Sequence, residues 1–336
     1  MVNFGIVGIG FMGVTHYKAI QKVRGAKVGA IVSRDEKKLQ GDWRNIQGNF
    51  GGSGGMHDLS KVSAYKQLDK LLDDPNIDVV DICLPTPMHV EMSLRALQSG
   101  KHVFLEKPIA LTIADANKLV LAAKRYGKSL MVAHVLRYFP EFRLIKQLVE
   151  SEEHGRVRAA HFKRIISKPS WWGPNELDRT GGPAIDLHIH DTDFLQFVFG
   201  MPDSVVSQGT FGKRKVIEYI HTLYKFPKNI SISAEGGWLA QPGCPFEHGY
   251  DVYFEDATLK FNSLSGQSPQ LLTNDGKVRK PRLSRTDGFV GELQEVTDAI
   301  RGNRKSIDLD VTSARNSLDI CLKEIRSVHQ SRRISI

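Results

Sequence analysis

The stretch that decides the fold lies near the start of the chain, where residues 2–13 read VNFGIVGIGFMG. An apolar run leads there directly into three closely spaced glycines, Gly8, Gly10 and Gly13. A helical pattern follows the glycines, and a second apolar run, Ala26 to Val32, follows the helix. A glycine-rich turn between a strand and a helix, with another strand beyond, is typical of the first unit of a dinucleotide-binding domain.

Each glycine in this turn has a distinct physical role. Gly8 permits a tight turn, Gly10 lets the backbone approach a pyrophosphate, and Gly13 lets the helix pack closely against the strand. The phosphates would then lie at the positive end of the helix, next to Phe11 and Met12. We therefore assign Gly8, Gly10, Phe11, Met12 and Gly13 to cofactor binding.

The end of the second strand, Ser33-Arg34-Asp35, bears on the choice of cofactor. Ser33 and Arg34 offer a hydroxyl and a guanidinium group, which suit the 2′-phosphate of NADP. An acidic residue there would instead bind the ribose hydroxyls of NAD and repel a phosphate. Asp35 follows one position later and could still reach the ribose. Both cofactors therefore stay open, with NADP slightly favoured.

Short apolar strands continue to alternate with helices through the first part of the chain, which predicts a doubly wound parallel sheet. In such sheets ligands bind outside the carboxyl ends of the strands. Pro85, Thr86 and His89 follow one of these strands, and Glu106 and Lys107 follow the next. We assign all five to the cofactor site, near the nicotinamide.

The pattern changes in the second half, where turn-bounded runs of alternating apolar and polar residues extend from 157 to 261. They predict an antiparallel sheet, and the runs 289–301 and 313–330 predict two closing helices. A chain of 336 residues is also long for a single core. We therefore predict two domains, residues 1–128 and 129–336.

Residues 181–193, which read GGPAIDLHIHDTD, interrupt the strand pattern and can be interpreted in two ways. As a strand, the segment would point Asp186, His188 and His190 to one side, like a metal-binding trio. As a helix, it would place Asp186, His190 and Asp193 on one face, while His188 points away.

The flanking residues favour the helix. Pro183 suits a first helical position, the apolar pattern runs to Phe199, and Gly200 is a typical stop. The segment is also too long for an ordinary strand. We therefore predict a helix in which Asp186 and His190 are neighbours, suited to proton transfer, and we predict no metal site.

Composition excludes several other classes. The net charge of +9 is spread along the chain without a basic run or a nucleic-acid motif, so we expect no nucleic-acid partner. No signal peptide or apolar stretch long enough for a bilayer is present, and three scattered cysteines fit a reducing compartment. The sequence predicts a cytoplasmic protein without membrane association.

Three motifs together resemble one known family. The fingerprint at 8–13, the run Glu106-Lys107-Pro108, and the Gly181-Gly182 pair followed by Asp186 and His190 resemble the Gfo/Idh/MocA oxidoreductases. These are NAD(P)-dependent dehydrogenases of sugars, inositols and related polyols. The resemblance implies a Rossmann domain followed by an α+β domain for substrate binding and oligomerisation. Its large open, mainly antiparallel sheet commonly forms homodimers or homotetramers.

The resemblance also implies roles for individual residues. Lys107, Asp186 and His190 match the family's catalytic residues, and the peptide bond after the lysine is often cis. Chemistry agrees, because histidine is suited to accept the proton of an alcohol, an aspartate can orient it, and an ammonium can polarise the oxygen. Asp193 could bind a second substrate hydroxyl, and Trp172 could stack on a sugar face.

Other readings stay open at this point. A glycoside-cleaving relative that uses NAD transiently, a non-catalytic cofactor sensor, and a metallohydrolase based on His188 and His190 are the alternatives. Arg137 could approach the cofactor or pack between domains, and the glycine-rich stretch 48–55 could be a lid or a surface insertion. The sequence does not specify which sugar or polyol is bound.

Overall fold

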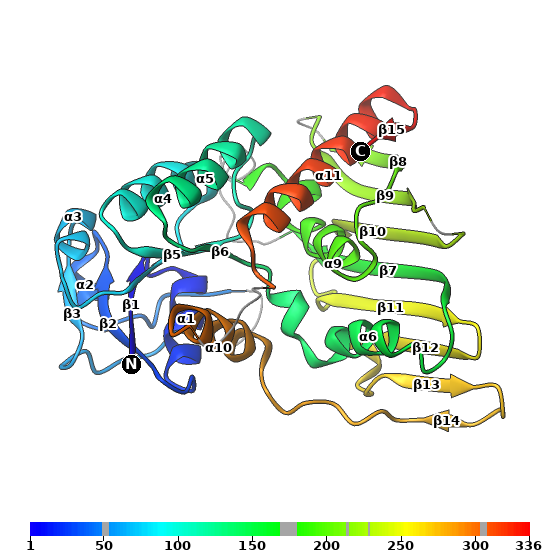
Figure 1. The fold of residues 1–336 in the computed structure, drawn as a ribbon, viewed down its shortest axis with the longest axis horizontal. Helices are drawn as coiled ribbons and strands as arrows, with labels where there is room; N and C mark the ends of the chain where they lie inside the picture. The colour runs from blue at the N-terminus through cyan, green and yellow to red at the C-terminus, as the bar shows by residue number, and fades with distance from the viewer. Residues whose placement is uncertain (49–53, 169–179, 213–214, 228, 303–307) are drawn as a thin grey trace. The chain divides into compact units, whose positions relative to one another are not determined.

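The structure is a computed structural model, and it describes residues 1–48, 54–168, 180–212, 215–227, 229–302 and 308–336. The chain forms two compact units, each built from two separate stretches. The first unit comprises Met1–Val135 and Asp287–Arg315, and the second comprises Leu136–Thr286 and Asn316–Ile336. Each unit has a β-sheet of its own (Figure 1).

The first unit contains a sheet of six parallel strands in the order β3-β2-β1-β4-β5-β6. This confirms the predicted doubly wound parallel sheet. The strand order reverses between β1 and β4, and their carboxyl ends are where open α/β sheets bind ligands. The strands are β1 (Val2–Val7), β2 (Ala26–Val32), β3 (Ser63–Tyr65), β4 (Val79–Ile82), β5 (His102–Glu106) and β6 (Leu130–Ala133).

The helices of this unit begin and end at suitable residues. Thr112 caps α5 by accepting the Asp115 N–H at 3.1 Å, and Gly127 ends the helix in the left-handed conformation. Among the helices in the described ranges, none has the length and apolar character needed to cross a bilayer. The helices are α1 (Phe11–Ile20), α2 (Glu36–Leu39), α3 (Leu68–Leu72), α4 (His89–Gln98), α5 (Ile113–Tyr126) and α10 (Gly288–Ile300), with the 3₁₀ turn η1 (Thr86–Met88) before α4.

The boundary between the units differs from the predicted division at residue 128. β6 pairs in parallel with β5, so the first unit runs on to Val135. α10 also belongs to the first unit, where it packs against α1. The predicted division would cut the parallel sheet and remove α10 from its neighbour. Sequence patterns gave no sign that the chain returns to its first unit after so many residues.

The second unit contains a sheet of nine strands in the order β14-β13-β12-β11-β7-β10-β9-β8-β15. All neighbours are antiparallel except β7 and β10, which confirms the predicted mainly antiparallel sheet. The short strands β13, β14 and β15 were not predicted; β14 and β15 form the two edges of the sheet. The strands are β7 (Val157–Ser167), β8 (Ser204–Phe211), β9 (Ile217–Lys225), β10 (Ser231–Ala240), β11 (Glu247–Phe254), β12 (Ala257–Asn262), β13 (Gln270–Thr273), β14 (Val278–Arg279) and β15 (Ile334–Ser335).

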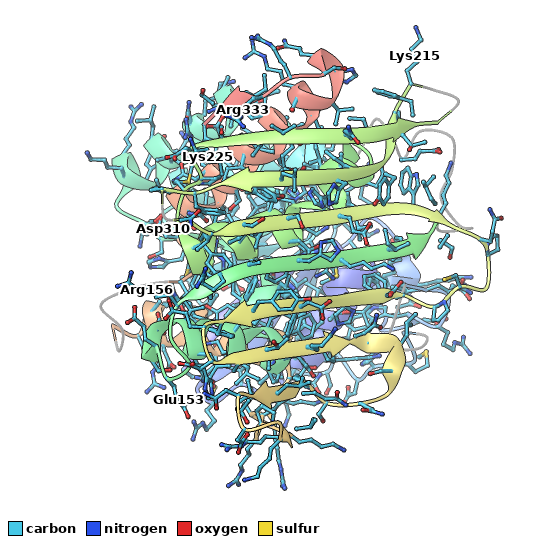
Figure 2. All side chains as sticks on the ribbon, turned by 90° about the vertical axis from the view of Figure 1, so that its right-hand side faces the viewer. Glu153, Arg156, Lys215, Lys225, Asp310 and Arg333 are labelled. Carbon is cyan, nitrogen blue, oxygen red and sulfur yellow. The ribbon has the colours of Figure 1, made fainter. Side chains whose placement is uncertain are left out.

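Helices cover one face of this sheet: α6 (Pro140–Ser151), α8 (Pro183–Asp186), α9 (Ile189–Phe199) and α11 (Val311–Gln330). Phe142 of α6, Phe194 of α9 and Phe162 of β7 are fully buried between the two layers. No described helix of this unit covers the other face, which Figure 2 shows toward the viewer. We call it the uncovered face; it includes Leu223 and Tyr253, which are 51% and 42% exposed.

Candidate active site

The turn between β1 and α1 has the geometry that a pyrophosphate needs. Gly8 has a φ of 97°, and a Cβ there would lie 2.6 Å from the Cys83 carbonyl oxygen, so only glycine fits. A Cβ at Gly13 would lie 2.1 Å from the carbonyl oxygen of Gly8. Around Gly10, by contrast, no described atom lies within 4 Å of an added Cβ. The backbone that leads into Phe11 and α1 is therefore open to a ligand, as the fingerprint requires.

At the end of β2, one of the residues considered for ribose binding, Asp35, caps a helix. Asp35 is the N-cap of α2, and its Oδ1 accepts the N–H groups of Lys37 and Lys38 at 2.9 and 3.4 Å. The Ser33 hydroxyl oxygen accepts the N–H of Asp35 at 3.1 Å, and Arg34 is exposed. The structure thus uses the carboxylate to start a helix and leaves the guanidinium at the strand end.

The end of β4 is closed by a buried histidine. The His89 ring lies between two backbone carbonyls, with Nδ1 2.8 Å from the oxygen of Pro108 and Nε2 2.8 Å from that of Leu84. Burial lowers the pKa of His89. Both ring nitrogens face the backbone, so His89 joins the ends of β4 and β5. This differs from the cofactor contact that we predicted from its position. Thr86, in η1, is also buried.

The end of β5 carries the predicted lysine. Glu106 is buried, and its Oε2 accepts the backbone N–H of Lys107 at 3.0 Å. The peptide bond between Lys107 and Pro108 is cis, as the resemblance implied. Because the strands are parallel, the loops after β1, β2, β4 and β5 share one edge of the sheet (Figure 1). That edge carries the other predicted cofactor residues: Gly8, Gly10, Phe11, Met12, Gly13, Ser33, Arg34, Pro85, Thr86, Glu106 and Lys107.

In the second unit, the segment that we predicted as one helix forms two. α8 ends at Asp186 and α9 begins at Ile189, with a break between them. At the break the His188 N–H donates to the Pro183 carbonyl oxygen at 2.9 Å instead of to residue 184. The helical interpretation is thus confirmed over the strand, but Asp186 and His190 belong to different helical segments. Within residues 182–190 they are the two side chains that are not buried.

His188, at the break, is fully buried among polar groups. Its Nε2 lies 3.3 Å from the Tyr224 hydroxyl and 3.4 Å from Oε2 of Glu324. A Cβ on Gly236 of β10 would lie 2.7 Å from its Nδ1, so the ring packs directly on the sheet. This agrees with a structural role for His188 and not with a metal pair formed with His190.

Asp193 has a different role from the predicted one. It is completely buried, and its two carboxylate oxygens accept Nε and Nη2 of Arg137 at 2.8 and 2.5 Å. The Ser317 hydroxyl donates to the same carboxylate at 2.7 Å. We therefore assign Asp193 as the buried partner of Arg137 in place of a substrate ligand. Arg137, whose role the sequence left open, packs inside the second unit.

Some of the sequence predictions lie outside the described residues. Trp172, the predicted sugar-stacking residue, is one of them, together with its neighbour Trp171. Most of the glycine-rich stretch 48–55 also lies outside the described ranges, so the two interpretations of that stretch stay open.

One buried ion pair escaped the sequence interpretation. Arg164 of β7 donates Nε and Nη2 to the carboxylate of Asp191 in α9, at 2.7 and 3.0 Å. Both side chains are buried. The sequence did contain a sign of this pair: Arg164 occupies an inward position in an alternating strand, and a buried charge there needs a partner of opposite charge.

A group of three possible metal ligands lies in the core of the first unit. One ligand atom each from His16, Asp81 and Cys83 lies within 4.8 Å of the others, which is close enough to hold a metal ion. The same atoms already contact one another, however, with His16 Nδ1 3.0 Å from Asp81 and 3.4 Å from the Cys83 sulfur. Burial also raises the pKa of Cys83, which keeps its thiol protonated. We interpret the group as a hydrogen-bonded cluster.

Known proteins resemble part of the chain in sequence. It is 29% identical over 200 residues to myo-inositol 2-dehydrogenase of Thermotoga maritima, covering 59% of this chain and 55% of that protein. It is 33% identical over 134 residues to 1,5-anhydro-D-fructose reductase of Ensifer adhaerens, covering 39% and 40% of the two chains. The matches thus span about half the length, or less, of these curated relatives.

Similarity of fold extends further. The crystal structure of an oxidoreductase from Agrobacterium radiobacter, in complex with NAD+, L-tartaric acid and magnesium, superimposes with a TM-score of 0.83 at 19% identity, covering 99% of this chain and 98% of that one. Residues 2–134 match the oxidoreductase family with an NAD-binding Rossmann fold, and residues 142–260 match the GFO/IDH/MocA C-terminal domain. The chain belongs to the Gfo/Idh/MocA family of oxidoreductases.

Proposed function

We propose that the protein is an NAD(P)-dependent dehydrogenase or reductase of a sugar or cyclic polyol, with Lys107, Asp186 and His190 as its catalytic residues. The observation that carries the proposal is the exposure pattern of the segment around the helix break. Asp186 and His190 alone escape burial within residues 182–190, although their neighbours on both sides are packed into the core. Relatives named as a polyol dehydrogenase and a sugar reductase support the substrate class.

The chain's own residues supply the acid–base part of this reaction. When bound, the nicotinamide accepts or returns the hydride. His190 takes the hydroxyl proton on one of its imidazole nitrogens, and Asp186 orients the ring and stabilises its charged form. The Lys107 ammonium polarises the reacting oxygen and stabilises the negative charge that develops there. These roles require a proton acceptor and a fixed cation, which the three residues provide.

We further propose that NADP is preferred over NAD. The support comes from the end of β2, where the Asp35 carboxylate caps α2 and Arg34 is exposed. The cap takes up one oxygen of this carboxylate with two backbone N–H groups, and the exposed guanidinium beside it is well suited to bind a phosphate. Comparing KM for the two cofactors tests this, and a strong preference for NAD would contradict it.

The main proposal is tested with a panel of sugars and inositols in both reaction directions. The absorbance of the nicotinamide, followed separately with NAD and with NADP, should change with at least one of these compounds. A product released without net change in the cofactor would instead favour the glycoside-cleaving alternative. Cofactor binding without any turnover would favour a non-catalytic cofactor sensor. A metal ion in stoichiometric amount in the purified protein would favour the metallohydrolase alternative.

We also propose that the protein forms a homodimer or homotetramer through the uncovered face. Leu223 and Tyr253 support this, because they expose apolar surface on a sheet face that carries no described helix. Sedimentation of the intact protein tests it, with Leu223→Glu as the disruptive variant. A monomeric wild-type protein would contradict this part without affecting the proposed reaction.

A further inference from the structure

A cluster of ionisable side chains is buried behind the end of β5, and the proposed reaction gives it no role. Its members come from four different elements or their ends, and all but the cysteine are buried. Charged side chains are seldom fully buried unless they are paired. We call this group the His16 cluster; it consists of His16 (α1), Asp81 and Cys83 (β4 and its end), Glu106 (β5) and Glu292 (α10).

The His16 ring lies between two carboxylates. Its Nδ1 is 3.0 Å from both oxygens of Asp81, and its Nε2 is 3.3 Å from Oε1 of Glu106. Burial works to lower the pKa of His16, but the charge and hydrogen bond of Asp81 outweigh it, so the pKa lies well above its ordinary value. An imidazolium has an N–H on each side: here the Nδ1 side hydrogen-bonds to Asp81, and the Nε2 side makes an ion-pair contact with Glu106 without hydrogen-bond geometry.

Glu106 contacts both His16 and the backbone of Lys107. Its Oε1 faces the imidazolium, while its Oε2 accepts the backbone N–H of Lys107 at 3.0 Å. Burial works to raise the pKa of Glu106, but the close contact with His16 and its charge lower it on balance, so the group is a carboxylate. Because each oxygen has its own partner, the Glu106 side chain cannot rotate without breaking one of the two contacts.

Glu292 provides a natural contrast inside the same cluster. Its Oε1 lies 3.9 Å from Nε2 of His16, and among the described residues neither of its oxygens has a hydrogen-bond partner. Burial raises its pKa well above the ordinary value, which makes it a neutral acid. The imidazolium therefore contacts Asp81 on one side and the Glu106 carboxylate on the other, and Glu106 also accepts the N–H of Lys107.

We propose that His16 is a positioning residue for Lys107, acting through Glu106. By holding the Glu106 carboxylate in one orientation, it fixes the backbone from which the lysine side chain starts. On the other side of Lys107, the contact of His89 with the Pro108 carbonyl oxygen restrains Pro108. The inference rests on the proposed function, in which Lys107 acts on the reacting oxygen.

A matched pair of isosteric variants tests it: Glu106→Gln and Asp81→Asn. Each removes one negative charge from the same imidazolium. In Glu106→Gln, Asp81 still keeps the ring an imidazolium, so the Nε2–H of His16 and the Lys107 N–H compete for the single acceptor oxygen of the glutamine. The asparagine can donate to Nδ1 and leave the contact between His16 Nε2 and Glu106 in place. Glu106→Gln should therefore lower kcat at least tenfold, and Asp81→Asn less than threefold.

Two more variants complete the set. His16→Gln should lower kcat as strongly as Glu106→Gln, with the Kd of the cofactor within twofold of the wild type. Glu292→Gln should leave kcat unchanged, because the amide replaces an acid that is already neutral. Equal losses of kcat in Glu106→Gln and Asp81→Asn, or full kcat in a folded His16→Gln, would overturn the inference.

Hydrogen–deuterium exchange of the Lys107 amide gives a second readout that needs no substrate. It should be severalfold faster in His16→Gln and Glu106→Gln than in the wild type, and unchanged in Asp81→Asn. A purely structural role would speed exchange in all three variants and across the whole sheet. A wild-type protein without turnover would end the proposed function, whereas the exchange comparison would still decide whether His16 fixes this backbone.

Discussion

In the first unit Lys107 follows directly from a buried parallel strand, whereas in the second unit Asp186 and His190 lie on either side of a break in a helix. The strand is held by the hydrogen bonds of a regular sheet. The helical segment is held by side chains, because three successive residues of α9 bond to three different parts of the unit: Asp191 to Arg164, Thr192 to Glu324 and Asp193 to Arg137.

The difference shows two ways of fixing the residues that we propose to be catalytic. A parallel sheet places every strand end at one edge whatever the side chains are, so position follows from topology. A short helix beside a break has no such guide, and α9 depends on buried pairs in which each charge needs its partner. The second unit should therefore be the more sensitive of the two to single substitutions away from its reactive residues.

The largest effects are expected at one proposed catalytic residue from each region. Lys107→Ala and His190→Ala should each lower kcat by roughly 10²–10⁴-fold, because each removes a group that stabilises charge or transfers a proton in the reaction. Cofactor titration should show binding close to that of the wild type. Exposed residues give matched controls, Lys124→Ala and His329→Ala. A rate within severalfold of the wild type would remove that residue from the mechanism.

The anchoring pairs of α9 provide the next largest effect, on stability. Arg137→Met should lower the free energy of unfolding by about 3–5 kcal/mol, because it leaves the Asp193 carboxylate buried without its cation. Urea denaturation measures the loss. The double variant Arg137→Met with Asp193→Leu is the control and should recover much of the stability. If the single variant is as stable as the double, the pair does not anchor the helix.

A smaller effect is expected at the cofactor end of the first unit. Arg34→Ala should raise KM for NADP by roughly tenfold or more, because a charge-assisted hydrogen bond contributes about 1.5–3 kcal/mol. KM for NAD should change less than about twofold. Lys37→Ala, an exposed neighbour on α2, is the control. Equal changes for both cofactors would show that Arg34 does not recognise the 2′-phosphate.

The smallest effect is a pH dependence in the His16 cluster. Burial raises the pKa of Glu292, so the folded protein holds a proton that the unfolded chain releases above the ordinary carboxyl range. This penalty grows with pH, by at most about 1.4 kcal/mol per unit, and it is absent in Glu292→Gln. The unpaired polar atoms of the amide offset much of this gain, so the variant should be more stable than the wild type by only about 1 kcal/mol at neutral pH. Its advantage should disappear within about one to two pH units below neutral and become a deficit toward pH 4, where the wild-type carboxyl is protonated in both states. An advantage that grows in acid would contradict the assignment.

What could be predicted from sequence follows the same division. The glycine turn and the ends of β4 and β5 were placed correctly because fixed local spacings and sheet topology determine them. Pro183 and Gly200 gave the helical character of the second site segment. The break at His188 could not be found this way, because it depends on contacts with Tyr224 and Glu324.

Other residues were misassigned for a related reason. Asp193 has the spacing of a residue on the same face as His190, and spacing alone made it a substrate ligand. Its partner Arg137 is far away in sequence, so the buried pair became visible only in three dimensions. His89 was placed at the correct strand end, but the two carbonyls that enclose it come from separate loops.

The return of α10 to the first unit has a consequence for synthesis. Glu292 and the neighbouring Phe289 pack against His16, so residues from near the end of the chain complete a core that starts near its beginning. A nascent chain exposes this side of α1 until the strands of the second unit have left the ribosome. A fragment of residues 1–135 should for the same reason be prone to aggregate, and supplying α10 as a separate peptide should rescue it.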